Sequence, residues 1–152
     1  MYKKWCGYFL FGIFIFCLDR VSKIAALTHC YQFCYIINQF VSFQVYFNRG
    51  VAWSLFNSDD TMTFILVSFI QFLITGFVCL YAYRRYSEGF TVFAELLIIV
   101  GSLSNIVDRI VYSGVIDFII LSCNGFVWPV FNVADIAIVS GVMMMMLLQH
   151  EK

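Results

Sequence analysis

Charge is the scarcest property of this sequence. Only 12% of its 152 residues are Asp, Glu, Lys or Arg, whereas 62% are hydrophobic and the mean hydropathy is +0.90. Nine basic and nine acidic residues cancel to a net charge of zero, which argues against a nucleic-acid partner. The composition is typical of a membrane protein. At this length we expect one domain over residues 1–152, with room for about four membrane spans.

Proline is almost absent, so long apolar runs continue without interruption. The single proline, Pro129, lies between runs, and four stretches are long enough to cross a bilayer. They cover about residues 5–26, 62–83, 90–110 and 131–148. The first stretch begins like a signal peptide, but no small-residue cleavage site follows it, so we expect it to be retained as a span. The predicted fold class is an all-α integral membrane protein with four transmembrane helices.

The basic residues at the ends of these stretches predict the orientation. They precede the first stretch and follow the second and the fourth, as Lys3, Lys4, Arg84, Arg85 and Lys152. Basic residues favour the cytoplasmic side of a membrane. We therefore expect both termini to be cytoplasmic.

With this topology, most of the remaining polar residues gather at the outer membrane–water boundary. They come from the ends of the first and third stretches, the start of the fourth, and the two outer loops: Asp19, Lys23, Asn48, Arg49, Gly50, Asn105, Asp108, Arg109, Asp117, Asn132 and Asp135. A charged side chain near hydrocarbon costs roughly 2.5–3.5 kcal/mol on insertion scales. The gathering therefore indicates a functional site at the outer face, whereas a channel or transporter would carry polar groups through the bilayer. The sequence assigns no role to Glu95, early in the third stretch.

The spacing of these residues places several of them on common helix faces. Asp19 and Lys23 are four residues apart and can pair. Asn105, Asp108 and Arg109 follow at i, i+3 and i+4, which predicts a second polar face. The planar guanidinium of Arg109 can clamp a carboxylate or a loop carbonyl. Buried pairs that fix the helix bundle would explain much of this pattern.

Pairing does not explain Asp117 and Asp135. Each lies between apolar residues, and neither has a cation beside it in the sequence. Two carboxylates brought together at a partly dry surface tend to share one proton. One can then act as general base for a water while the protonated partner donates to a carbonyl oxygen. We interpret these residues as an aspartic hydrolase pair that needs neither metal nor cofactor.

Serine mechanisms are less consistent with the sequence. The two histidines, His29 and His150, fall on opposite sides of the membrane in the predicted topology. Ser22 and Lys23 are adjacent, and adjacent residues on a helix point about 100° apart.

The segments between the stretches predict a small surface element. Residues 42–47 alternate between polar and apolar side chains, which is typical of a strand with one apolar face. We expect a small sheet resting on the membrane surface, because an isolated strand edge invites aggregation. The residues Asn48-Arg49-Gly50 then predict a turn. From about Tyr112 to Val130, turn signals such as Asn124-Gly125 surround a short element that is either helix or strand.

Six cysteines leave a second interpretation open. Cys30, Cys34 and Cys123 lie outside the stretches, where a disulfide is chemically permitted. A four-span membrane thiol oxidoreductase could use them, although such an enzyme leaves the aspartates unexplained. The Cys-x-x-x-Cys spacing with one nearby histidine is poor evidence for a metal site, so we predict none.

Five motifs resemble those of the bacterial lipoprotein signal peptidases (signal peptidase II), over nearly the whole chain. In order, they are Asp19-x-x-Ser22-Lys23, Asn48-x-Gly50-x-Ala52-Trp53, Gly101-x-x-x-Asn105-x-x-Asp108-Arg109, Val115-Ile116-Asp117-Phe118 and Phe131-Asn132-x-Ala134-Asp135. Each motif is weak alone, but five in order, combined with the predicted spans and sidedness, are specific.

The resemblance implies an aspartic endopeptidase of the bacterial plasma membrane with its active site at the outer face. It would remove the signal peptide from diacylglyceryl-modified prolipoproteins by cutting before the lipidated cysteine. Asp117 and Asp135 would form the catalytic dyad. The supporting residues would be Asp19, Lys23, Asn48, Gly50, Gly101, Asn105, Asp108, Arg109 and Asn132.

The resemblance also implies other features of the protein. Its outer elements would be a β-cradle and a short helix or loop, the latter after Tyr112. Besides lipidated prolipoproteins and membrane lipid, cyclic peptides of the globomycin type would bind at the dyad, and the chain would act as a monomer without a cofactor. Ser104 stands where the family commonly has glycine, so we expect looser helix packing there. The external cysteines are not part of the family pattern.

Overall fold

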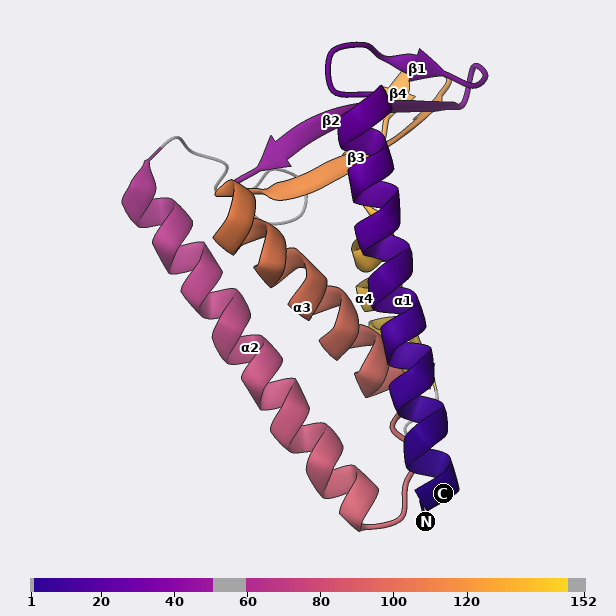
Figure 1. Ribbon diagram of the computed structural model, residues 1–152, viewed down its shortest axis with the longest axis vertical. Coiled ribbons are helices and arrows are strands. Elements are labelled where there is room, and N and C mark those ends of the chain that lie inside the picture. Colours follow the sequence, from indigo (N-terminus) through magenta and orange to yellow (C-terminus); the bar gives the residue numbers. More distant parts are fainter. Residues whose placement is uncertain (1, 51–59, 148–152) are drawn as a thin grey trace.

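The computed structural model describes residues 2–50 and 60–147, which form four helices and four strands (Figure 1). In chain order the elements are α1 (Tyr2–His29), β1 (Tyr35–Ile36), β2 (Val41–Asn48), α2 (Thr61–Ser87), α3 (Phe93–Tyr112), β3 (Val115–Cys123), β4 (Phe126–Val127) and α4 (Val133–Leu147). The strands lie across one end of the helices, and the first turn of α1 lies at the opposite end (Figure 1). The Ala52-Trp53 part of the second motif falls outside the described residues.

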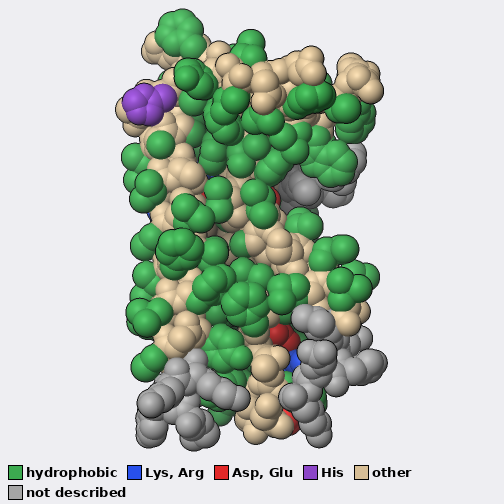
Figure 2. All heavy atoms as spheres, turned by 90° about the vertical axis from the view of Figure 1, so that its right-hand side faces the viewer, with side chains coloured by type: hydrophobic (Ala, Val, Ile, Leu, Met, Phe, Trp, Pro, Cys, Tyr) green, Lys and Arg blue, Asp and Glu red, His purple; other side chains and the backbone are tan. Residues whose placement is uncertain are grey.

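Each of the four predicted stretches coincides with a helix. In the described part of the chain, one of these helices has the length and apolar composition of a membrane span. Among the residues that the structure describes, α2 is the single helix long and apolar enough to cross a bilayer, and α4 is a shorter apolar helix of 15 residues. Figure 2 shows hydrophobic side chains over most of one face of the molecule, with few charged groups among them. That surface suits a lipid environment, and crossing by all four helices stays a prediction.

Helix α3 lies at the centre of the bundle and approaches α4 backbone to backbone. A Cβ atom added at Gly101 would lie 2.5 Å from the carbonyl oxygen of Ala134, and one added at Gly141 would lie 2.6 Å from that of Ala94. These distances leave no room for a side chain. Gly101 therefore has a packing role, next to the first turn of α4.

Substitution of Gly101 by Ala is expected to lower the stability of the protein by about 1–3 kcal/mol, because the added methyl group forces α3 and α4 apart. The measurement is the thermal midpoint of unfolding in detergent. Gly76→Ala in α2 is the matched control, since its Cβ would meet nothing within 4 Å. A Gly101→Ala midpoint no lower than that of Gly76→Ala would contradict the packing role.

The sheet is antiparallel, with the strand order β1-β2-β3-β4. This confirms the predicted small sheet, and the strand predicted at residues 42–47 lies within β2. The predicted alternation is only partly correct: Val45 is buried, but Phe47 is 38% exposed. The register between β2 and β3 shifts between Phe43 and Tyr46, and such a bulge interrupts the alternation of faces.

The segment after Tyr112 is a pair of strands, so the helix or loop implied by the family resemblance is wrong for these residues. Ser113 ends α3 in a left-handed conformation (φ 55°), and the β-branched run that follows pairs with β2. Asn124 and Gly125, both with positive φ, form the predicted turn between β3 and β4.

An apolar cluster joins the end of α1 to the underside of the sheet. It consists of Ala26, Cys30, Val45, Ile116 and Phe118. Since neighbouring residues on a strand face opposite ways, Ile116 and Phe118 enter this cluster while the side chain between them points to the other face.

Candidate active site

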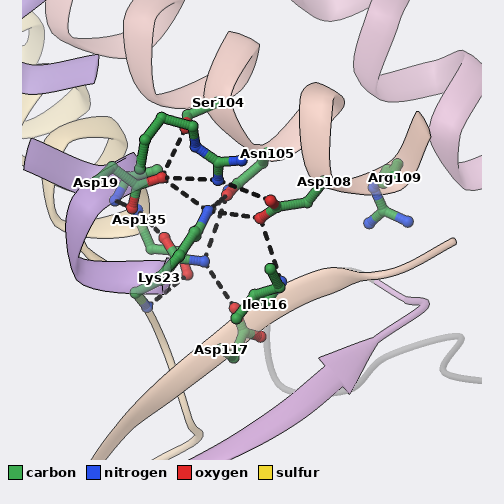
Figure 3. A network of polar contacts seen from close by, with 12 residues as sticks. Asp19, Lys23, Ser104, Asn105, Asp108, Arg109, Ile116, Asp117 and Asp135 are labelled. Atoms are coloured by element: carbon green, nitrogen blue, oxygen red, sulfur yellow. Dashed lines mark hydrogen bonds and ion pairs between the residues drawn. The ribbon is translucent and has the colours of Figure 1, made fainter. Parts of the chain in front are cut away.

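Most of the polar residues singled out in the sequence meet where the sheet crosses the helix ends, among them Asp19, Lys23, Asn105, Asp108, Asp117 and Asp135 (Figure 3). All eleven predicted site residues lie within the described part of the chain. Asp117 projects from β3, Asn132 precedes α4, and Asp135 lies in its first turn. Asp117 and Asn132 are buried, and Asp135 is partly exposed.

Asn132 connects the two aspartates. Its Nδ2 donates to Asp117 Oδ1 over 2.7 Å, and its backbone N–H donates to Asp135 Oδ2 over 3.2 Å. In return, Asp135 N donates to Asn132 Oδ1 over 2.9 Å. This reciprocal pair at the start of α4 is a capping box, which fixes the rotamer of Asp135 through the helix terminus. The i, i+3 spacing of the two residues is its sequence signal.

Two further asparagines complete the surroundings of the aspartates. Asn48 Nδ2 donates to Asp117 Oδ2 over 3.0 Å, and Asn105 Nδ2 donates to Asp135 Oδ1 over 2.8 Å. Asn48 Oδ1 also accepts from Gly50 N over 2.9 Å, which confirms the predicted turn as an Asx turn. Each aspartate therefore accepts from neutral amide donors, and neither forms a direct ion pair with a residue in the ranges 2–50 and 60–147.

Burial, with a smaller contribution from the nearby charge of Asp135, raises the pKa of Asp117 to about 7. The hydrogen bonds from Asn48 and Asn132, and the charge of Lys23, favour the carboxylate and oppose this shift. At neutral pH the two carboxyl groups can therefore hold a proton between them. This is the protonation state that acid–base hydrolysis by two carboxylates requires.

A second cluster of charges consists of Asp19, Arg20, Lys23 and Asp108, and it adjoins Asp135 through Asn105. Lys23 Nζ is 2.8 Å from Asp19 Oδ2 and 2.7 Å from Asp108 Oδ2, which confirms the predicted Asp19–Lys23 pair. Arg20 Nη2 is 2.7 Å from Asp108 Oδ1 and 3.3 Å from Asp19 Oδ2. Lys23 Nζ also donates to Asn105 Oδ1 over 2.9 Å, so this cluster contacts the residue that holds Asp135.

Ser104 tightens the second cluster instead of loosening the helix packing. Its hydroxyl donates to Asp19 Oδ2 over 2.6 Å, and the residue is fully buried. The expected looser packing at this position is therefore wrong, because the hydroxyl fills the space with a hydrogen bond.

Arg109 lies apart from the cluster in Figure 3, so the predicted face shared with Asn105 and Asp108 is wrong for Arg109. Its Nη1 donates to the carbonyl of Arg49 over 3.0 Å, its Nη2 donates to the carbonyl of Gly50, and its Nε donates to Gln71 Oε1 over 2.8 Å. Adjacent helical residues point about 100° apart, which separates Arg109 from Asp108. The guanidinium clamps the loop carbonyls after β2, one of the two roles predicted for it.

Three participating residues were not predicted to have these roles: Arg20, Gln71 and Ser104. The sequence does contain a signal for Gln71, because it is the single amide side chain in the largely apolar helix α2. Glu95, to which the sequence assigns no role, forms an ion pair with Arg85 Nε over 2.9 Å. Glu95 lies in the first turn of α3, at the end of the helix away from the site.

The cysteines offer no comparable site. All six are free, and burial together with the nearby Cys34 raises the pKa of Cys30, which makes its thiol less reactive. Within residues 2–50 and 60–147, no three His, Cys, Asp or Glu side chains gather as potential metal ligands. The geometry therefore does not favour the thiol oxidoreductase interpretation.

Comparison with known proteins decides the family. A family model described as signal peptidase (SPase) II matches residues 11–150. The chain belongs to the signal peptidase II family. It is 31% identical to the lipoprotein signal peptidase of Dichelobacter nodosus, over 96% of this chain and 95% of that protein. The lipoprotein signal peptidase of Clostridium novyi is 34% identical, over 90% of each chain.

Solved structures agree with this membership. A bacterial membrane enzyme solved by the in meso method at 2.3 Å resolution superposes with a TM-score of 0.74 and 26% identity, covering 94% of this chain and 88% of that one. A second such structure, at 1.9 Å resolution, gives a TM-score of 0.73 with 96% and 94% covered. Membership of the signal peptidase II family supports a membrane hydrolase that acts in lipoprotein maturation.

Proposed function

We propose that the chain is an aspartic endopeptidase that removes the signal peptide from diacylglyceryl-modified prolipoproteins, cutting before the lipidated cysteine. Asp117 and Asp135 are the catalytic pair. The observation that carries this proposal is that Asn132 hydrogen-bonds to both carboxylates, one of which, Asp117, has a raised pKa. The test is cleavage of a lipidated prolipoprotein peptide by the purified chain.

In the proposed reaction the two carboxyl groups carry one proton. The ionised group removes a proton from a water molecule, whose oxygen attacks the scissile carbonyl carbon. The protonated group donates its proton to the carbonyl oxygen, giving a neutral tetrahedral diol. Collapse of the diol breaks the C–N bond, and the amine of the lipidated cysteine leaves with a proton from the pair. The water supplies all the atoms added, so the reaction consumes no cofactor.

The remaining residues have supporting roles in this proposal. Asn48, Asn105 and Asn132 orient the dyad, and Arg109 holds the carbonyls at Arg49 and Gly50 near the substrate path. Gly101 allows α4 to approach α3 one residue before Asp135, at Ala134.

The proposed setting is a bacterial plasma membrane crossed by all four helices. The positive-inside rule then makes both termini cytoplasmic and places the sheet and dyad at the outer face. The partners are lipidated prolipoproteins, membrane lipid and cyclic peptides of the globomycin type. The chain acts as a monomer and has no nucleic-acid partner.

The pH dependence of kcat/KM should report the shared proton. Since the pKa of Asp117 is raised to about 7, we expect kcat/KM to fall about tenfold per pH unit above neutrality, as the pair loses its last proton. Asn48→Ala removes a hydrogen bond that favours the carboxylate, so the pKa rises further and the alkaline limb moves to higher pH.

Gln44→Ala is the matched control for this pH experiment, since Gln44 is on the same strand but contacts Tyr46. Its alkaline limb should coincide with that of the wild type. An Asn48→Ala limb that stays in place or moves to lower pH would contradict the assignment of the limb to Asp117.

A further inference from the structure

Two buried carboxylates contact the backbone immediately before the two proposed catalytic residues. Asp19 Oδ1 accepts from the N–H of Ala134 over 2.8 Å, and Asp108 Oδ2 accepts from the N–H of Ile116 over 3.2 Å. Ala134 precedes Asp135, and Ile116 precedes Asp117. Each catalytic residue is therefore one peptide unit away from a carboxylate of the charge cluster.

Each of these N–H groups depends on its carboxylate as a hydrogen-bond acceptor. The Ala134 N–H belongs to the first turn of α4, where backbone donors have no partner within the helix. Ala134 is 0% exposed and Ile116 is 1% exposed, so water does not reach either residue freely. A buried N–H without an acceptor is unfavourable, and the backbone therefore follows the position of its carboxylate.

The positions of the two carboxylates relative to each other are set by two cations from α1. Lys23 Nζ and Arg20 Nη2 each lie between Asp19 and Asp108, with distances of 2.7–3.3 Å. Two carboxylates and two cations make the cluster neutral. Lys23 alone would leave it with a net charge of −1 in a buried setting, and the two carboxylates would then repel each other.

We propose that Arg20 is a positioning residue, which sets the separation of Asp117 and Asp135 by holding Asp19 and Asp108 together. The proposal rests on the proposed aspartic peptidase function. The chain of contacts runs from Arg20 to Asp108 to the backbone of β3, and from Arg20 to Asp19 to the backbone of α4. Two carboxyl groups share a proton only when they are close, and a misplacement of about 1 Å can reduce a rate by about a hundredfold.

The test compares two substitutions of Arg20 with a matched control at the other end of the bundle. Arg20→Gln removes the cation, whereas Arg20→Lys retains it. Arg85→Gln is the control, because Arg85 and Arg20 have similar exposure, 16% and 19%, and each pairs with a buried carboxylate. The kinetic constants are measured on purified, monodisperse enzyme with a lipidated prolipoprotein peptide.

We expect Arg20→Gln to lower kcat by about 10- to 100-fold and to change KM less than about threefold, since the dyad and not the peptide-binding surface is displaced. Arg20→Lys should restore kcat to within about tenfold of the wild type. Arg85→Gln should leave both constants within about threefold. If Arg20→Gln gives no folded enzyme, the kcat and KM of Arg20→Lys decide the question.

Three results would overturn the proposal. They are a wild-type kcat for Arg20→Gln, an equal loss of kcat in Arg85→Gln, and a folded Arg20→Lys enzyme without activity. Failure of the proposed function is a different result. In that case the wild type does not cleave the peptide, or Asp117→Asn and Asp135→Asn cleave it normally.

Discussion

Asp117→Asn and Asp135→Asn are each expected to reduce turnover of a lipidated prolipoprotein peptide by about three orders of magnitude or more. An amide cannot act as general base and cannot share the proton of the pair, so the water is not activated. The fold should persist, because an asparagine oxygen can still accept from Asn132. The measurement is the single-turnover rate of peptide cleavage, with the thermal midpoint of unfolding recorded for each variant.

The double variant distinguishes a shared-proton pair from two independent residues. Residues that act as a unit lose activity non-additively, so the double variant should be about as slow as either single variant. Asp60→Asn is the matched control, since Asp60 is an exposed carboxylate that caps α2 through Thr63. A double variant whose loss equals the product of the single losses, or a single variant with near-normal turnover, would contradict the mechanism.

Removal of the diacylglyceryl group from the substrate is expected to lower kcat/KM by at least about a hundredfold. Each CH₂ group left in lipid is favourable by about 0.8 kcal/mol, so two acyl chains hold the cysteine at a defined depth. The lipid thus sets the height of the scissile bond before the peptide makes contacts, which is orientation contributing to catalysis. The outer strands of the sheet and the residues next to them expose large apolar side chains that suit this environment: Phe33, Tyr35, Ile36, Phe126 and Trp128.

The comparison uses lipidated and unmodified forms of one peptide in the same detergent. A peptide with a single acyl chain is the control for partial anchoring, and its kcat/KM should lie between the other two. Equal cleavage of the lipidated and unmodified peptides would contradict this prediction, because the site would then bind the peptide without any contribution from the lipid.

The sequence predicts the helices and several contacts around Asp117 and Asp135 because the signals for them are local. The four apolar stretches needed only composition and length, and the Asp19–Lys23 pair needed only helical spacing. Asn132 and Asp135 have the i, i+3 spacing of a capping box, and the structure places both in that motif.

The errors arose where tertiary contacts outweigh local patterns. The segment 115–127 reads as helix, loop or strand until β2 provides a partner, and pairing then selects the strand. Helical spacing groups Arg109 with Asp108, but its guanidinium donates to the carbonyls of the loop after β2. Ser104 and Arg20 were not given their roles because their partners lie 85 and 88 residues away.

The most direct test of the central claim is product analysis after incubation of the purified chain with a diacylglyceryl-modified prolipoprotein peptide. The proposal predicts two products, an intact signal peptide with a free carboxyl end and a fragment that begins with the lipidated cysteine, and it predicts neither product with Asp117→Asn. Mass spectrometry identifies both fragments. An intact peptide, a cut at any other bond, or the same products from Asp117→Asn would contradict the account.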